Sequence, residues 1–236
     1  MLSGSIRPIR RVVAPVRDQV QQMLSSAILA GSLLPGDRII ERKICEMTGA
    51  SRASVREALR HLESQGLVTA IPNRGIVVTR TTADEAENIY ELRAVLEGLA
   101  ARRCASNATE SQLSELQRCL KNFADAAHSG NRSEALAIKN EFYECLLESS
   151  GNKFVADVHR ALQGRIVALR AVSLSTEGRL NQSLAEITRI VDAIVARDGT
   201  RAERESIHHV LKAGSIAVDA VRARDEVTRT TSNENQ

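Results

Sequence analysis

The chain has 236 residues, of which 26% are charged and only 2% aromatic, and its formal net charge is +3. This length suits two domains of the usual size of about 100 to 200 residues. No apolar run approaches the roughly 20 residues needed to cross a bilayer, and the N-terminus lacks the hydrophobic core of a signal peptide. We therefore expect a cytoplasmic protein without membrane contact. The positive charge is uneven, because residues 1–78 hold eleven Lys and Arg against six Asp and Glu, which favours a polyanionic partner for that part.

The first residues, 1–12, show no apolar periodicity and are expected to form a flexible arm. A helix is predicted from about Pro15 to Ala30, because Pro suits the first turn of a helix and Gly31 suits its exit. Residues 32–37 are predicted to form a turn, and residues 38–40 a short strand.

The segment from Glu41 to Gly66 is typical of a helix-turn-helix. Its first helix, 41–48, ends at Gly49, where a left-handed exit costs nothing. Ser51 caps a second helix, whose apolar face is formed at three- and four-residue spacing by Val55, Ala58, Leu59 and Leu62. The polar face of its first two turns carries Ser51, Arg52, Ser54 and Arg56. Polar and cationic residues at a helix N-terminus contact phosphates and base edges, so this helix is predicted to read DNA.

A basic hairpin follows the second helix. The short β-branched runs 67–71 and 76–78 are joined by a turn that places Arg74 between Asn73 and Gly75. Each Arg by itself could be an ordinary solvated charge. Turn, cap, helix and basic hairpin occur in the order of a winged helix-turn-helix, so we predict a DNA-binding domain over residues 13–79.

The run AGSLLPGDRIIERKICEMTGASRASVREALRHLESQGLV resembles the N-terminal domain of the GntR family of bacterial transcription regulators. This resemblance implies DNA contacts on the first helix of the motif, on the opening of the second and on the wing. The implied residues are Arg42, Ser51, Arg52, Ser54, Arg56, Asn73, Arg74 and Gly75. Arg52 is the best candidate for a guanine contact, since its planar fork matches O6 and N7.

From residue 82 onward the pattern is helical without interruption by strands, so the fold class is mostly α. After a linker at 80–81, Thr82 and Glu85 form a capping box, and we expect an all-α bundle over residues 82–225 followed by a disordered tail, 226–236. Six helices are predicted, at about 83–106, 110–128, 132–149, 153–175, 180–197 and 200–224. A bundle of this size can enclose a ligand between facing helices.

The pieces IYELRAVLEGLAARRCA, EFYECLLESSGNKF and AIVARDG resemble the ligand-sensing FCD domain of the FadR-like branch of the same family. Most such domains hold a divalent metal through an Asp and a His four residues apart and two further His. Here the corresponding positions are Lys139, Tyr143, Ile187 and His209. A charged Lys and an Ile cannot ligate a metal, so we predict no metal or other cofactor. A different alignment would leave Glu141, Glu144, His208 and His209 as alternative ligands.

Lys139 could instead bind the carboxylate of a small organic acid, although it could also turn outward or pair with Glu186 or Glu141. Arg93 is the stronger candidate, because Tyr90, Arg93 and Glu97 share one helical face and the resemblance places this Arg near the effector. Arg165, Arg170 and Asn152 are weaker candidates, and a position on the solvated surface explains either Arg more simply. The candidate effector-binding residues are Arg93, Lys139, Tyr143, Asn152, Arg165 and His209.

The two resemblances together imply a homodimeric transcription regulator that binds a palindromic operator in double-stranded DNA. We expect a repressor that releases DNA when a small organic acid binds in the helical domain. An acyl-CoA-responsive regulator is the alternative. An enzyme is a remote one, because the sequence has no nucleophile motif, phosphate loop or coherent pair of carboxylates.

Overall fold

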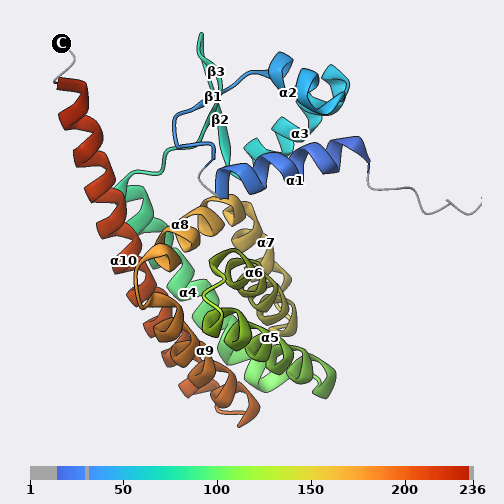
Figure 1. Ribbon diagram of the computed structural model, residues 1–236. Coiled ribbons are helices and arrows are strands. Elements are labelled where there is room, and N and C mark those ends of the chain that lie inside the picture. Colours follow the sequence, from blue (N-terminus) through green and yellow to red (C-terminus); the bar gives the residue numbers. More distant parts are fainter. Residues whose placement is uncertain (1–14, 30–31, 234–236) are drawn as a thin grey trace, which may run out of the picture. The chain divides into compact units, whose positions relative to one another are not determined.

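The computed structural model describes residues 15–29 and 32–233, with side chains to residue 226, and the chain divides into two compact units between Val78 and Thr79 (Figure 1). The predicted flexible arm, 1–12, lies outside the described residues. The mostly α fold is confirmed. No helix among the described residues has both the length and the apolar character needed to span a membrane.

The first unit is a winged helix-turn-helix. Its elements are α1 (Val16–Leu29), β1 (Arg38–Ile39), α2 (Glu41–Thr48), α3 (Arg52–Ser64), β2 (Val68–Ile71) and β3 (Gly75–Val78). The three strands form an antiparallel sheet in the order β1-β3-β2, in which β3 pairs with both of the others. The predicted apolar face of α3 is buried in the core of this unit, together with side chains of α1 and the sheet.

Local sequence explains the turn between α2 and α3. Gly49 ends α2 in the left-handed conformation, with φ 68°, and its N–H donates to the carbonyl of Cys45. Ser51 then caps α3, because its Oγ accepts a hydrogen bond of 3.1 Å from the N–H of Ser54. These two residues set the direction in which α3 leaves the turn.

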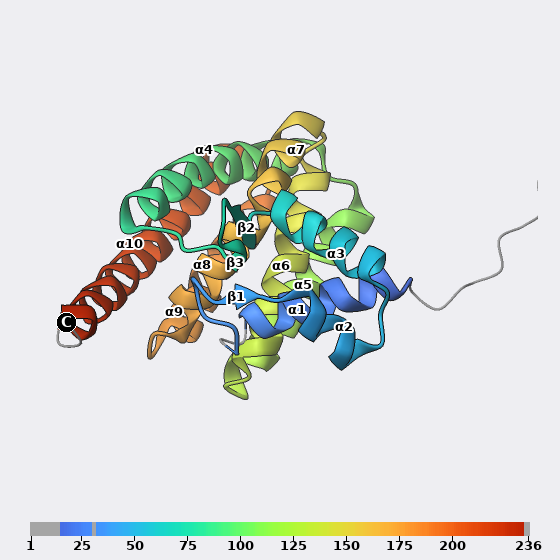
Figure 2. The ribbon, with the colours of Figure 1, turned by 90° about the horizontal axis from the view of Figure 1, so that it is seen from above.

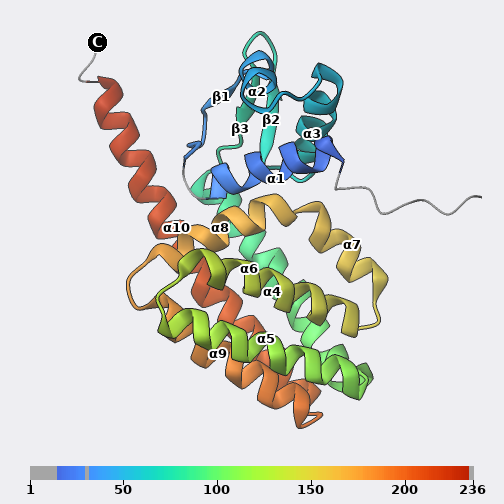
Figure 3. The ribbon, with the colours of Figure 1, turned by 45° about the vertical axis from the view of Figure 1, so that its right-hand side comes forward.

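The second unit consists of seven helices among the described residues. They are α4 (Ala83–Asn107), α5 (Glu110–His128), α6 (Arg132–Ser149), α7 (Lys153–Ala161), α8 (Gln163–Ser175), α9 (Arg179–Val195) and α10 (Gly199–Asn233). Helix α10 runs alongside α4, as Figures 1 and 2 show, and α5 packs on α6 and α9 (Figure 3). Capping boxes are present at Thr82–Glu85, as predicted, and at Thr109–Gln112.

The prediction of one helix over 153–175 is wrong, because the chain leaves the helical conformation at Leu162 and divides into α7 and α8. Val155 of α7 packs in the core formed with α5, α6 and α9, whereas Ile166 of α8 packs in a separate core with α10. One straight helix could not bury both apolar faces in these two cores. No Gly or Pro occurs at Leu162 to signal the break.

The predicted end of the last helix near residue 224 is also wrong. Helix α10 continues to Asn233, through most of the segment predicted as a disordered tail. Neither Gly nor Pro follows Gly214 in the sequence, so nothing terminates the helix at the predicted position. Residues 234–236 lie outside the described part of the chain.

The close packing of α4 on α10 depends on Gly214. A Cβ atom at Gly214 would lie 2.8 Å from Cγ and 2.9 Å from Cβ of Tyr90, both closer than van der Waals contact. We expect Gly214→Val to lower the free energy of unfolding by about 3 kcal/mol, because the buried interface must separate. The exposed neighbour Ser215 is the control, and Ser215→Val should change stability by less than about 0.5 kcal/mol. Equal urea midpoints for the two variants would show that the interface tolerates the added volume.

Candidate DNA-binding surface and buried ligand site

The opening of α3 presents polar atoms to solvent. Arg52 is exposed, and among the described residues no carboxylate lies within ion-pair distance of it. Ser51 is exposed but engaged in the cap, with its Oγ 3.0 Å from the Oγ of the half-buried Ser54. Arg52 is therefore the cation at this helix end that is free to contact a base or a phosphate.

Two other predicted DNA contacts form ion pairs within the first unit. Arg56 of α3 pairs with Glu41 of α2 at 2.9 Å, and Arg42 pairs with Glu46 along α2 at 3.5 Å. Exposed pairs of this kind contribute about 0–1 kcal/mol, so a phosphate can replace either carboxylate at small cost.

In the wing, Gly75 follows the predicted cation Arg74 and lies close to Arg38, which is not among the predicted DNA contacts. Asn73 and Gly75 have φ angles of 62° and 81°, and the N–H of Arg74 donates to the carbonyl of Ile71 at 3.0 Å. A Cβ atom on Gly75 would lie 3.7 Å from Nε of Arg38, whose strand pairs with β3. The pairing of β1 with β3 brings Arg38 to the wing, and only knowledge of the strand order could have predicted this.

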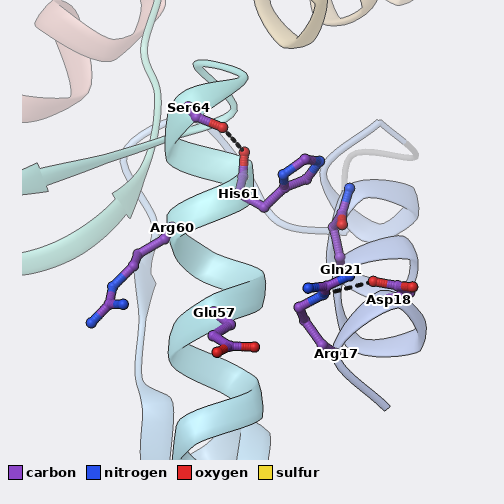
Figure 4. A pocket seen from close by; sticks show the side chains of 7 residues that line it. All are labelled: Arg17, Asp18, Gln21, Glu57, Arg60, His61 and Ser64. Atoms are coloured by element: carbon purple, nitrogen blue, oxygen red, sulfur yellow. Dashed lines mark hydrogen bonds and ion pairs between the residues drawn. The ribbon is translucent and has the colours of Figure 1, made fainter. Parts of the chain in front are cut away.

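An open groove of about 570 Å³ lies between α1 and α3 (Figure 4). It is lined by Arg17, Asp18, Gln21, Glu57, Arg60, His61 and Ser64. Its cations and carboxylates are mixed, and Arg17 already pairs with Asp18 at 2.8 Å. None of the predicted DNA contacts lines this groove, so it is separate from the surface formed by the opening of α3 and the wing.

Charged side chains gather in the interior of the second unit, where apolar residues are the usual filling. The buried polar cluster consists of Arg93, Glu97, Lys139, His159, Arg170, Arg179, Ser183, Glu186 and His209. These residues come from α4 and from α6 to α10. Burying charges is costly unless they are paired and hydrogen-bonded, so the partners of each group indicate what the cluster can bind.

One ion pair of the cluster joins Arg93 and Glu97, one turn apart on α4. Nε of Arg93 donates to Oε1 of Glu97 at 2.8 Å, and Nε2 of His159 lies 3.2 Å from the same oxygen. Burial by itself raises the pKa of Glu97, but Arg93 and His159 more than offset it and hold this pKa well below its usual range. Glu97 is therefore an anion that neutralises Arg93.

A second pair joins Arg179 and Glu186, both on α9. Two guanidinium nitrogens of Arg179 donate to the two oxygens of Glu186, at 2.9 and 2.6 Å. Nδ1 of His209 lies against Oε2 of Glu186, and the half-exposed Lys212 lies 3.2 Å from Oε1. This carboxylate neutralises Arg179 and orients the ring of His209, so that Nε2 of the ring faces Lys139.

Lys139 has no carboxylate partner within the described residues. Its Nζ donates to Oγ of Ser183 at 2.9 Å and lies 3.5 Å from Nε2 of His209. The pKa of Lys139 is lowered well below its ordinary value by burial and by the nearby guanidiniums of Arg170 and Arg179. The predicted alternatives, an outward Lys139 or a pair with Glu186 or Glu141, are wrong because this amine is buried and bonded to neutral groups.

Arg170 is the other buried cation without a carboxylate. Its Nη1 donates to the side-chain carbonyl of Asn140, and its guanidinium lies 4.2 Å from the ring centroid of Tyr143. Burial, with a smaller contribution from Arg93, lowers the pKa of Arg170 to about 10. The expectation that Arg170 is a solvated surface residue is wrong, since 2% of it is exposed.

Buried donors without partners surround these two cations. Nine buried side-chain atoms of the described residues make no hydrogen bond, and four of the nine are guanidinium nitrogens, which can only donate. The donors are Nη1 of Arg93, Nε and Nη2 of Arg170, Nε of Arg179, and the hydroxyls of Tyr143, Ser173 and Ser206. Unpaired buried donors are rare in folded proteins, so this excess favours an acceptor-rich, anionic ligand.

Two predicted effector residues have other positions. Asn152 caps α7, since its Oδ1 accepts hydrogen bonds from the N–H groups of Phe154 and Val155 at 3.1 and 3.4 Å. Arg165 is half-buried on α8 and lies outside the buried polar cluster. The structure thus brings together Arg93, Lys139, Tyr143 and His209 and adds Arg170.

Family models match both units of the chain. The model described as "Bacterial regulatory proteins, gntR family" matches residues 16–78, and the model of the FCD domain matches residues 88–212, more than half of the chain. The chain belongs to the GntR family and carries an FCD domain. It is a DNA-binding transcription regulator, as the sequence analysis predicts.

Several relatives of this GntR regulator span most of its length. It is 29% identical to the uncharacterized HTH-type transcriptional regulator YdhC of Bacillus subtilis, over 81% of this chain and 86% of that protein. It is 26% identical to the HTH-type transcriptional repressor RspR of Escherichia coli, over 83% and 86%. The solved structure titled "E. coli McbR/YncC" has a TM-score of 0.75 at 21% identity, covering 88% of this chain and 99% of that one. The solved structure of a putative GntR regulator from Rhodococcus sp. RHA1 has a TM-score of 0.73 at 22% identity, covering 86% of this chain and 98% of that one. Both solved structures show the same fold as this chain.

The FCD domain of this regulator does not suit the divalent metal that the resemblance implies. Nζ of Lys139 lies 3.5 Å from Nε2 of His209, the nitrogen that a metal would need, and Ile187 is buried in the apolar core. The phenol of Tyr143 lies among guanidiniums, which repel a second cation. These residues do not supply the ligand set that the FCD metal needs.

The alternative metal ligands do not converge either. Glu141 and His208 are exposed, and Glu144 pairs with Arg160 at 3.2 Å. Across the described part of the chain, no group of three or more His, Cys, Asp and Glu side chains is placed to hold a metal.

His209 makes the stability of the regulator depend on pH. Burial, with Lys139 adding to it, lowers the pKa of His209 from 6.5 to about 3. Between these values the unfolded chain binds a proton that the folded chain does not, so stability is lost as pH falls from 6.5. We expect about 2 kcal/mol of this loss between pH 6.5 and 4.5, measured by urea unfolding.

The matched pair for this pH dependence is His209→Gln and His128→Gln. His128 is exposed at the end of α5, so its replacement should leave the pH slope unchanged. His209→Gln should flatten the slope between pH 6.5 and 4.5. A wild-type slope retained in His209→Gln would contradict the assignment of this titration to His209.

Proposed function

We propose that this regulator is a cytoplasmic, homodimeric repressor that leaves a palindromic operator when a small carboxylic acid binds, without a metal, in the FCD domain. The observation that carries the proposal is Arg170, a buried guanidinium with two unpaired nitrogens and no carboxylate among the described residues. A buried cation of this kind is costly unless an anion neutralises it, and the effector would supply that anion.

The carboxylate would be held from two sides. Arg170 of α8 and Arg93 of α4 both lie against the ring of Tyr143, with guanidiniums 4.2 and 5.9 Å from its centroid. Each has at least one unpaired nitrogen, and the hydroxyl of Tyr143 is also unpaired. A carboxylate accepts charge-assisted hydrogen bonds from such a group of donors, and these are about twice as strong as neutral ones.

Release of DNA follows if the acid binds one arrangement of the helices better than another. Its carboxylate would draw α8, which carries Arg170, and α4, which carries Arg93, toward one anion. The regulator would then bind acid and operator with opposite preferences, because each ligand favours a different arrangement.

Relatives and surface residues support the remaining parts of the proposal. RspR is named a repressor, and a relative from Paenarthrobacter nicotinovorans, 27% identical over 83% of this chain and 85% of that protein, is named a probable D-xylose utilization operon transcriptional repressor. Leu92 and Val95 of α4 are 40% and 65% exposed, which suits a helix face covered by a second copy. The acyl-CoA alternative has no such support, because the buried polar cluster offers charges where an acyl chain needs apolar walls.

Arg52→Ala tests the DNA-reading part of the proposal. The probe is a labelled duplex selected from a random-sequence pool by the wild-type protein. Loss of a bidentate guanine contact costs about 1–3 kcal/mol, so we expect roughly 10- to 100-fold weaker binding in fluorescence anisotropy. The control is Arg60→Ala, an exposed residue on the same helix in the groove of Figure 4, which should bind within about threefold of the wild type. Equal losses in both variants would mean that Arg52 contributes only general charge.

A further inference from the structure

Two basic side chains of the buried polar cluster, Arg170 and Lys139, have no carboxylate partner among the described residues, and each can hold one anionic group of a ligand. Resting on the proposed carboxylate site, we infer that the effector is a dianion whose two anionic groups are bound at Arg170 and at Lys139. A dicarboxylate has this chemistry.

Basic side chains outnumber carboxylates in the cluster. Among the described residues it holds four Arg and Lys side chains and two carboxylates. Glu97 neutralises Arg93 and Glu186 neutralises Arg179, each through two hydrogen bonds. The two groups that remain, Arg170 and Lys139, are hydrogen-bonded only to neutral partners.

The unpaired buried atoms form two groups, one on the side of Arg170 and one on the side of Lys139. Arg93, Tyr143 and His159 each leave an atom unpaired near Arg170, to which they are linked through the ring of Tyr143. On the side of Lys139, Nε of Arg179, the partner of Glu186, is unpaired, and so is Oγ of Ser206, one turn before His209 on α10. Lys139 and Tyr143 are one turn apart on α6, so a single small molecule can extend along this helix face from one group to the other.

Binding of the second anionic group raises the pKa of Lys139. Burial and the cations Arg170, Arg179 and Arg93 lower this pKa in the free protein, and Glu97 opposes them. Glu186 acts on Lys139 through His209, which lies between them. An anion beside Nζ raises the pKa again, so binding of the dianion takes up protons at pH values between the pKa of Lys139 in the free protein and its pKa in the complex.

The experiment compares acids that differ in one charge, using full-length wild-type protein. Calorimetric titrations pair butyrate with succinate and propionate with malonate. We expect one dianion to bind roughly 10- to 100-fold more tightly than its monoanionic partner, as an added charge-assisted hydrogen bond predicts. Titrations in two buffers of different ionisation enthalpy, repeated over a range of pH, should show an uptake of protons for the dianion only.

Lys139→Met should reduce the affinity for the dianion to that for the monoanion and abolish the proton uptake. The control is Lys121→Met, an exposed Lys on α5, which should bind both acids like the wild type. The proton uptake of the wild type tests the inference independently of whether Lys139→Met folds.

The outcomes separate this inference from the proposed function. If neither monoanions nor dianions bind, the proposed carboxylate site fails and the inference fails with it. If butyrate binds as tightly as succinate, or dianion binding takes up no proton, the site stands and the dianion is refuted. A dianion preference retained in Lys139→Met would likewise exclude Lys139 as the second anchor.

Discussion

Arg170→Met is expected to abolish the response to carboxylic acids and to leave the folded protein at least as stable as the wild type. Removing Arg170 eliminates a buried cation that has no carboxylate partner and replaces it with an apolar side chain of similar length. Replacing buried charges by apolar groups is commonly neutral or stabilising by about 1–4 kcal/mol. The measurements are urea unfolding without ligand, and thermal unfolding with and without the acid that stabilises the wild type.

Arg93→Met is the matched control, because both guanidiniums lie over Tyr143 but only Arg93 has a carboxylate partner. Its loss leaves Glu97 buried beside His159 without its main counter-charge, which should cost about 3–5 kcal/mol. Arg170→Met is thus expected to leave the free energy of unfolding unchanged or higher, whereas Arg93→Met is expected to lower it. A large loss of stability in Arg170→Met would mean that this guanidinium is already neutralised in the folded protein.

Glu186→Gln is expected to lower the free energy of unfolding by about 3–5 kcal/mol. The carboxylate of Glu186 accepts two hydrogen bonds from Arg179 and contacts His209, and 2% of the residue is exposed. The amide keeps the shape of the side chain but leaves Arg179 as an unneutralised buried cation. Urea unfolding at pH 7 measures the loss.

Glu115→Gln provides the surface comparison for Glu186→Gln. Glu115 also pairs with an Arg, Arg118, but both side chains are about half exposed. Its replacement should leave the urea midpoint close to that of the wild type, since water screens the pair. Equal small effects of both substitutions would show that water reaches Glu186 and screens its ion pair with Arg179.

The fold of the first unit could be predicted because its turns are determined by single residues. Gly49 and Ser51 mark the turn between α2 and α3, and Asn73 and Gly75 mark the wing, each by a local conformational or hydrogen-bonding requirement. The position of Arg38 beside the wing could not be predicted in the same way. It depends on the pairing of β1 with β3, which joins residues far apart in sequence.

In the second unit, the sequence signals helix starts more reliably than breaks. The capping boxes at Thr82 and Thr109 predict the starts of α4 and α5. The break at Leu162 has no local signal, because the packing of α7 and α8 in separate apolar cores produces it. Breaks of this kind depend on tertiary contacts that a single sequence does not specify.

Only some residues of the buried polar cluster could be predicted from the sequence. The FCD resemblance predicted Lys139 and His209, and the spacing of Arg93 and Glu97 predicted that they share a helix face. Arg170 was only a weaker candidate, because α8 is apolar on several sides and its periodicity does not indicate whether Arg165 or Arg170 points inward. The structure decides between them by burying Arg170 against Tyr143 and leaving Arg165 half-buried.

The most direct test of DNA release by an acid bound at Arg170 is an anisotropy titration of the selected DNA duplex. Wild-type protein and Arg170→Met are each titrated with and without the acid that stabilises the wild type. We predict that the acid weakens DNA binding by the wild type and does not change DNA binding by Arg170→Met. This variant should bind the duplex as tightly as the wild type does without acid. Release of DNA from Arg170→Met at the same acid concentration would contradict it, because the acid would then act at a site other than the buried polar cluster.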